Sequence, residues 1–333
     1  MGFKDFFSPI TNMNTRQLQE FLDSNKDGGF TLLDVRQPGE YENARIPGSK
    51  LIPLPALNDR LSELDPQKPV IAYWAAGKRS RAAAQILTGR GFKQVYNLKG
   101  GIAAWQGHAA AGPIEMGMML LKGNETPREV ISIAYGLEEG LRKFYSTSTK
   151  LAIGPEVVDI LTKLAEIEVK HKQRLFDLYL TIDPTPLNMA AFENRITSEL
   201  MEGGFDADKL LEQNIPAMKT ASGVLDFAMM LEAQAMDLYM RYADKSEDPE
   251  VKNILFKMAN EEKAHLKSLG GLLDKNLDFK GFDWLLIRAW RRNRKVLRVP
   301  LRKWPVYFLI YEKTANRKNG IPVSPHPAWV AGN

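Results

Sequence analysis

Hydrophobic residues in the first third of the chain fall into short runs separated by turn-forming residues. The stretches 30–36 and 69–74 are apolar runs of strand length, and 93–101 has the same character. Between the second and third of these, 79–91 has helical spacing and ends at a glycine, where helices commonly stop. Strands that alternate with helices predict an α/β domain with a largely parallel sheet flanked by helices.

From Thr126 onward the apolar positions follow a helical period. Thr126 and Glu129 form a capping box, with Pro127 at the first helical position. We predict four long helices, at 127–147, 155–180, 223–244 and 249–270. The two hairpins are joined by a crossover, 181–222, that contains a minor helix near 190–201. Two helical hairpins joined by a long crossover predict an all-α four-helix bundle.

These patterns divide the chain into four parts. A segment rich in glycine and alanine, 107–117, is typical of a linker. We therefore predict an α/β domain at 1–110, a linker at 111–125, a helical bundle at 126–275 and a C-terminal extension at 276–333.

The composition is that of a globular protein, with 44% hydrophobic and 26% charged residues among 333. No apolar run approaches the roughly 18 residues that a membrane span needs. The N-terminus is too polar for a signal peptide, so we expect a cytoplasmic protein. The sequence has no cysteine, which excludes disulfides, thiolate catalysis and iron–sulfur ligation by this chain alone.

The C-terminal extension is strongly basic. Residues 280–318 hold twelve lysines and arginines against two acidic residues, and 282–297 adds tryptophans to the basic side chains. This pattern fits an interfacial helix in peripheral contact with an anionic membrane, or a segment packed on the protein's own bundle. We favour the packed segment. We see no nucleic-acid-binding motif and expect no specific nucleic-acid partner.

The helical part contains an internal repeat. Residues 155–171 and 249–265 are identical at nine of seventeen positions, and both end in Glu-x-x-His. Applying the same offset of 94 residues upstream aligns 130–145 with 224–239, so each half has a Glu on its first helix and a Glu-x-x-His on its second. A carboxylate and an imidazole at i and i+3 lie on one helix face and can reach a single ion.

The repeated residues form a candidate metal site. They are four glutamates and two histidines: Glu138, Glu168, His171, Glu232, Glu262 and His265. Four unpaired carboxylates inside a bundle would repel one another and be costly to bury, whereas two divalent cations would neutralise them. This is the ligand set of the carboxylate-bridged di-iron or di-manganese bundles. A degenerate bundle without metal is the alternative.

On these residues, 126–275 resembles the ferritin-like superfamily and, within it, the rubrerythrins. The resemblance implies that the six residues bind two iron ions, with manganese as an alternative and with Glu168 and Glu262 as bridging ligands. It also implies reduction of hydrogen peroxide or dioxygen. Rubrerythrins usually carry a further Glu where this chain has Ala235, and often a rubredoxin-like domain that is absent here. Electrons would then come from a separate donor protein. The alternatives are a non-catalytic sensor or binding protein and an iron-handling protein; a homo-oligomer is left open.

The first domain resembles the rhodanese-like family. Its motifs are LLDVRQPGEYENARIPG, the loop WAAGKRS and the closing YNLKGGIAAW. Rhodaneses carry their catalytic cysteine at the first loop position, where this chain has Trp74. The rest of the loop, Gly77, Lys78, Arg79 and Ser80, leads into a helix N-terminus that favours anions. We expect no sulfurtransferase activity, but a module that binds an anion or a sulfur species, a docking module, or a decayed scaffold. If Trp74 were an introduced change, a sulfurtransferase is the alternative.

Overall fold

The structure is a computed structural model that describes residues 10–76, 78–185, 188–196, 200–215 and 217–279. The N-terminal domain is built around one sheet of five parallel strands in the order β1-β5-β4-β2-β3. The strands are β1 (Thr11–Met13), β2 (Thr31–Asp34), β3 (Lys50–Leu51), β4 (Val70–Tyr73) and β5 (Val95–Leu98). The predicted parallel sheet is confirmed, and β2, β4 and β5 are the three predicted strands. The other two are too short to form a recognisable apolar run.

Both faces of this sheet are buried, because successive side chains of a strand point to opposite sides. Leu33 and Ala72 belong to one apolar cluster, which α3 covers, whereas Leu32 and Ile71 belong to the other, which α1 covers. The helices are α1 (Thr15–Ser24), α2 (Pro38–Asn43), α3 (Lys78–Gly89) and α4 (Gly101–Ala104), with 3-10 turns at Leu54–Ala56 and Leu61–Glu63. Helices on both faces are what a parallel sheet requires.

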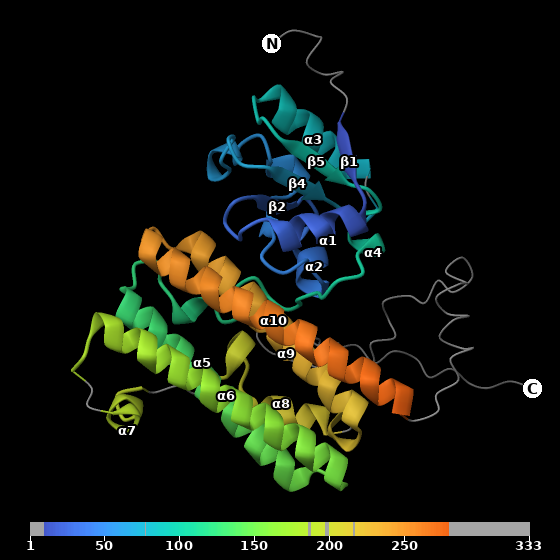
Figure 1. Cartoon of the computed structure of the whole chain (residues 1–333). Helices are drawn as coiled ribbons and strands as arrows, with labels where there is room; N and C mark the ends of the chain where they lie inside the picture. The colour runs from blue at the N-terminus through green and yellow to red at the C-terminus, as the bar shows by residue number, and fades with distance from the viewer. Residues whose placement is uncertain (1–9, 77, 186–187, 197–199, 216, 280–333) are drawn as a thin grey trace, which may run out of the picture.

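The helical part consists of two long antiparallel hairpins (Figure 1). The first is α5 (Pro127–Leu151) with α6 (Pro155–Ile182), and the second is α9 (Ala221–Lys245) with α10 (Pro249–Phe279). The crossover contains α7 (Met189–Glu193) and α8 (Ala207–Asn214), with 3-10 turns at Glu202–Gly204 and Ala217–Lys219, and a further 3-10 turn, Met118–Leu120, precedes α5. The predicted four-helix bundle is confirmed.

Two predicted helix ends are wrong. The last helix was predicted to end at 270, but neither Gly270 nor Gly271 adopts the left-handed conformation of a glycine cap, and α10 continues to Phe279. The minor helix predicted near 190–201 ends much earlier, at Glu193. Capping explains the correct starts: the side chain of Thr126 accepts from the backbone N–H of Glu129 at 3.4 Å, although this bond is long.

The bundle contains two apolar clusters separated along the helix axes. One includes Tyr135 of α5 and Phe176 of α6, and the other includes Leu141 and Leu161 of the same helices. The helices of the second hairpin, α9 and α10, also contribute residues to both clusters. All six candidate ligands fall between the two clusters on their helices, so they form a polar layer across the middle of the bundle.

The segment predicted as a linker, 111–125, is hydrogen-bonded along α9. Gln234 exchanges two hydrogen bonds with the backbone of Ala111, at 2.6 and 3.1 Å. Nη1 of Arg241 donates to the carbonyl oxygen of Ile114 at 2.8 Å. We call this segment the strap.

The N-terminal domain packs on α9 and α10 (Figure 1), and we call this contact the domain interface. At its centre Arg45 donates from Nε and Nη2 to Oδ2 of Asp237 at 3.0 and 2.8 Å, and both side chains are fully buried. The backbone N–H of Gly48 donates to the other oxygen at 3.0 Å. Burial opposes ionisation of Asp237, but the charges of Arg45 and Arg241 outweigh burial and lower its pKa.

Candidate metal centre

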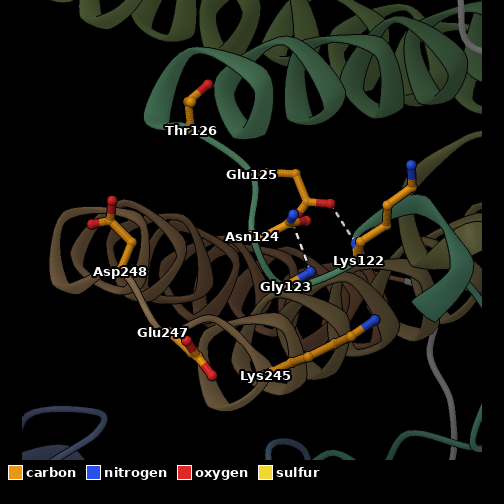
Figure 2. A pocket seen from close by; sticks show the side chains of 8 residues that line it. All are labelled: Lys122, Gly123, Asn124, Glu125, Thr126, Lys245, Glu247 and Asp248. Atoms are coloured by element: carbon orange, nitrogen blue, oxygen red, sulfur yellow. Dashed lines mark hydrogen bonds between the residues drawn. The ribbon is translucent and has the colours of Figure 1, made fainter.

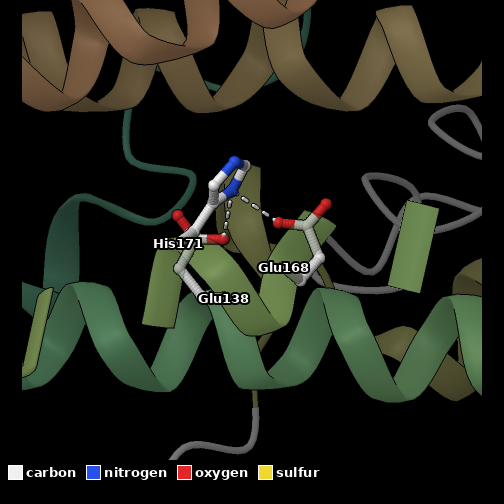
Figure 3. A group of neighbouring side chains, drawn as sticks. All are labelled: Glu138, Glu168 and His171. Carbon is white, nitrogen blue, oxygen red and sulfur yellow. Dashed lines mark hydrogen bonds and ion pairs between the residues drawn. The ribbon is translucent and has the colours of Figure 1, made fainter. Parts of the chain in front are cut away.

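The first group of candidate ligands joins α5 to α6 (Figure 3). Nδ1 of His171 lies 2.8 Å from Oε2 of Glu168 on the same helix and 3.3 Å from Oε2 of Glu138 on α5. All three side chains are buried. The i, i+3 spacing on α6 places the Glu and the His on one face, and the antiparallel packing of α5 brings the second Glu to them.

The second group repeats this arrangement on α9 and α10. Nδ1 of His265 lies 2.9 Å from Oε2 of Glu262 and 3.6 Å from Oε2 of Glu232. Both carboxylates are buried, while the imidazole is 17% exposed, against 3% for His171. Solvent therefore reaches the second group more easily than the first.

The two groups meet through their histidines. The rings of His171 and His265 are stacked, with centroids 4.1 Å apart and planes 9° from parallel. The structure therefore brings all six sequence-predicted residues into one layer inside the bundle, with equivalent roles for equivalent positions of the repeat.

Charges within this layer support one another. Burial opposes ionisation of Glu138, but the hydrogen bond and charge of His171 outweigh burial and lower its pKa. Burial likewise disfavours the charged form of His265, but the neighbouring carboxylates, with Glu232 foremost, raise its pKa. An ionised carboxylate inside a bundle attracts cations strongly because little solvent screens it.

The donor set fits a pair of divalent ions of the iron or manganese type. Within each group the ligand atoms lie within 4.8 Å of one another, so one ion can reach all three. Carboxylate and imidazole donors are typical of non-haem iron and manganese sites. Among the residues that the structure describes, Nε2 of buried His171 has no hydrogen-bond partner. Burying four carboxylates without cations would also carry a large desolvation cost.

The loop at the end of β4 is filled by its own side chains. The guanidinium of Arg79 lies 4.7 Å from the centre of the Trp74 ring, and the indole packs against the apolar core below. Ser80 is buried and donates to Oδ1 of Asn97 at 2.6 Å. Lys78 begins α3, and Gly77 lies outside the described residues. The first position of this loop is thus occupied by a packed indole.

A polar cluster that the sequence did not reveal lies beside the first group. Nζ of Lys172, the residue after His171, contacts the carboxylates of Glu139 and Glu193 at 2.5 Å each. Tyr135 donates to the same oxygen of Glu193 at 2.8 Å. The cluster ties α7 to the first hairpin. Its side chains come from three separate helices, so no local spacing pattern in the sequence predicts it.

A cleft of about 380 Å³ lies at one end of the bundle, near the start of α5 and the turn between α9 and α10 (Figure 2). Glu125 accepts from the backbone N–H groups of Lys122 and Gly123, the latter at 2.9 Å. Lys245 donates to the carbonyl oxygen of Leu121. Glu125 thus holds a turn within the strap, and Lys245 fastens the strap to α9. None of the six candidate ligands lines the cleft.

The described residues thus form a parallel α/β domain and a four-helix bundle that contains two carboxylate–histidine groups able to hold a metal ion. Residues 17–108 match the rhodanese-like domain family, and residues 223–280 match the rubrerythrin family. Through these two regions, the chain belongs to the rhodanese-like family and also contains a rubrerythrin domain, the ferritin-like bundle. The rubrerythrin domain implies a di-iron site.

Three relatives each match at most 30% of this chain. "Uncharacterized protein YqhL" of Bacillus subtilis is 44% identical over 80 residues, which cover 24% of this chain and 64% of that protein. "Putative sulfur carrier protein YrkF" of the same organism is 35% identical over 100 residues, 30% of this chain and 53% of that protein. A "Sulfurtransferase" of Allochromatium vinosum is 31% identical over 99 residues, 30% of this chain and 91% of that protein. The chain thus spans less than two thirds of the first two.

Among the residues that the structure describes, no helix is long and apolar enough to cross a membrane. The basic segment 280–318, with its predicted packing on the bundle or contact with a membrane, lies outside the described residues. Those interpretations and the cytoplasmic location stay predictions.

Sequence reasoning also missed the domain interface. Arg45, Asp237 and Lys263 look like ordinary charged residues in the sequence, and their partners lie far away along the chain. One signal was available in the repeat itself. Asp237 and Lys263 align with Lys143 and Val169 of the first half, so the two copies differ where one of them meets another domain.

Proposed function

We propose that the bundle holds two iron ions, or two manganese ions, and reduces hydrogen peroxide or dioxygen. The observation that carries this proposal is the meeting of two equivalent Glu, Glu, His groups in one buried layer. The six residues are Glu138, Glu168, His171, Glu232, Glu262 and His265. The ions, when bound, supply redox electrons and Lewis acidity.

The protein's own residues create the environment for that chemistry. The four carboxylates carry the negative charge that offsets two divalent cations, and Glu168 and Glu262 are the proposed bridging pair. The imidazoles add neutral ligands. Apolar clusters on both sides exclude water from the layer, which strengthens every charge interaction inside it. The greater exposure of His265 makes the second group the proposed side of entry for a small oxidant.

Reduction of hydrogen peroxide to two water molecules consumes two electrons and two protons. The sequence has no cysteine and therefore offers no thiolate-held iron centre of its own. We accordingly place the source of electrons in a separate donor protein, with protons supplied by solvent at the more exposed second group. A homo-oligomer remains compatible with this assignment.

The test combines metal analysis with peroxide consumption. The full chain is reconstituted anaerobically with ferrous iron, and its metal content and its re-oxidation by hydrogen peroxide are followed by absorption. We expect two metal ions per chain and faster oxidation by peroxide than by buffer alone. Glu138→Gln serves as a ligand variant and Glu166→Gln, an exposed residue on α6, as its matched control. Iron-free protein after careful reconstitution contradicts the proposal, and a metal-loaded protein inert toward peroxide and dioxygen favours an iron-handling protein.

For the rhodanese-like domain we propose a docking role without sulfur transfer. Although one relative is named a sulfurtransferase, Trp74 stands where the thiolate would be, and its ring is covered by Arg79. An assay with thiosulfate and cyanide should give no rate above buffer. Trp74→Cys restores a nucleophile beside Arg79 and provides the comparison; activity of the unaltered chain would contradict the docking role.

A further inference from the structure

The rhodanese-like domain contacts the bundle next to the second group of ligands. Lys263 lies on α10 between Glu262 and His265. Its Nζ donates to the carbonyl oxygen of Leu22 at 2.7 Å and lies 3.2 Å from Oδ1 of Asp23, both at the end of α1. The stretch of α10 that carries two ligands is therefore fixed to another domain at the residue between them.

The partner helix is fixed as well. Asp237 follows Glu232 on α9 by five residues, so it lies somewhat more than one helical turn away. It is the buried carboxylate that Arg45 and the backbone N–H of Gly48 contact across the domain interface. Both helices that supply the second group thus have an anchor on the same rigid α/β domain.

The first group has no such anchor at the equivalent positions. Lys143, which aligns with Asp237, is 63% exposed and pairs only weakly with Glu139 of its own helix, at 3.5 Å. Val169, which aligns with Lys263 and also lies between two ligands, is 48% exposed. The repeat therefore supplies two similar faces, and the rhodanese-like domain covers one of them.

We infer that the rhodanese-like domain positions the second ligand group, with Lys263 as the main positioning residue, and that the two metal-binding groups are unequal for this reason. The inference rests on the proposed function in assuming that both groups bind metal. Ligands must be held within about 0.5 Å of the productive geometry, so α9 and α10 must keep a fixed position relative to each other. Fixing both helices to one domain holds Glu232, Glu262 and His265 in this way, whereas the helices of the first group are tied only within their own part of the bundle, through Lys172 and Glu139.

Cobalt(II) titration of the full chain, followed by absorption, tests the inference. His171→Ala weakens the first group and leaves the second as the principal site, whereas His265→Ala does the opposite. Adding Lys263→Met to the His171→Ala chain should weaken cobalt binding about tenfold, at the lower end of the range for residues that orient metal ligands. Adding it to the His265→Ala chain should change the affinity less than twofold.

Two controls separate positioning from loss of charge. Lys170→Met removes an exposed lysine that lies between Glu168 and His171, as Lys263 lies between the ligands of the second group. It should leave cobalt affinity within twofold in both backgrounds. Lys263→Arg keeps a donor long enough to reach Leu22 and should recover most of the lost affinity, which a merely structural defect would not show.

The outcomes distinguish the two proposals. A wild-type chain that binds no cobalt overturns the proposed function and the inference together. Normal binding by wild type, with equal weakening by Lys263→Met in both backgrounds or none in either, overturns the inference alone. If neither histidine variant binds cobalt, Lys263→Met is compared in the otherwise unaltered chain, where the inference requires one of two binding steps to weaken and the other to persist.

Discussion

The two hairpins of the bundle carry the same ligands on their inner faces and differ on their outer faces. The α5–α6 hairpin exposes Lys143 and Val169, whereas at the equivalent places the α9–α10 hairpin contacts the rhodanese-like domain through Asp237 and Lys263. Inside, the chemistry of the site fixes the residue types. On the outer faces the two copies differ at the positions where the second one contacts the other domain, so comparing the copies locates the domain interface.

Removing the buried carboxylate of the second hairpin should have the largest effect. Asp237→Ala leaves the fully buried Arg45 without its carboxylate partner, which costs about 3–5 kcal/mol of folding free energy. The change is measured by urea unfolding of the full chain. The matched variant Lys143→Ala, at the equivalent exposed place, should stay within about 0.5 kcal/mol. Equal effects at the two positions would mean that the interface contributes no special stability.

Metal should stabilise both hairpins, and each ligand change should remove part of that effect. A ligand at about 100 times its dissociation constant stabilises a protein by roughly 2.7 kcal/mol. Manganese(II) should therefore raise the melting temperature of the wild type. His171→Ala and His265→Ala should each reduce this rise, and a variant carrying both should lose it. A metal-induced rise that survives in the double variant would place the ions elsewhere.

Strong acid should weaken the domain interface through protonation of Asp237. The folded-state pKa of Asp237 lies below its ordinary value of 3.8. Its contribution to stability is complete above roughly pH 4 and is lost as the pH falls through the lowered folded-state pKa. The basic groups facing it are Arg45 and Arg241. Asp237→Asn should flatten the stability profile below pH 4, and an unchanged profile would assign the acid sensitivity to other carboxylates.

Exchanging the exposed residue of the first hairpin should have the smallest effect. Val169→Lys gives α6 the residue that α10 has at the equivalent place, but the rhodanese-like domain lies on the other hairpin. We expect a change within about 0.5 kcal/mol and no gain in cobalt affinity. A tighter first group would show that a lysine between the ligands acts through its charge rather than through its contact with Leu22.

The candidate site was predictable because its information is local and repeated. The Glu-x-x-His spacing places two ligands on one face, and an offset of 94 residues shows the pattern twice, so the sequence alone identifies Glu168 and Glu262. The sheet and the four long helices were predictable for the same reason, since apolar periodicity is a local signal.

Other features depended on tertiary contacts that local patterns do not encode. The predicted end of α10 at 270 was wrong, because the helix continues through Gly270 and Gly271, and glycine is tolerated inside a helix. Arg45 and Asp237 are 192 residues apart, and no local sequence pattern around either residue predicts that they form a pair. Lys263 resembles any surface lysine until α1 is placed beside it. Which residues pair over such long sequence separations is decided by how the elements pack, and local spacing does not show it.

The strap has a consequence for how the two domains associate. Because it is hydrogen-bonded along α9 through Gln234 and Arg241, the rhodanese-like domain never diffuses far from its place on the bundle. Short tethers create effective concentrations of the order of mM, so even a weak contact remains closed. A buried ion pair adds little net stability, but a misaligned contact would leave Arg45 or Asp237 buried without its partner charge, which is costly. The strap therefore keeps the two domains close together, and the Arg45–Asp237 pair fixes how they are aligned.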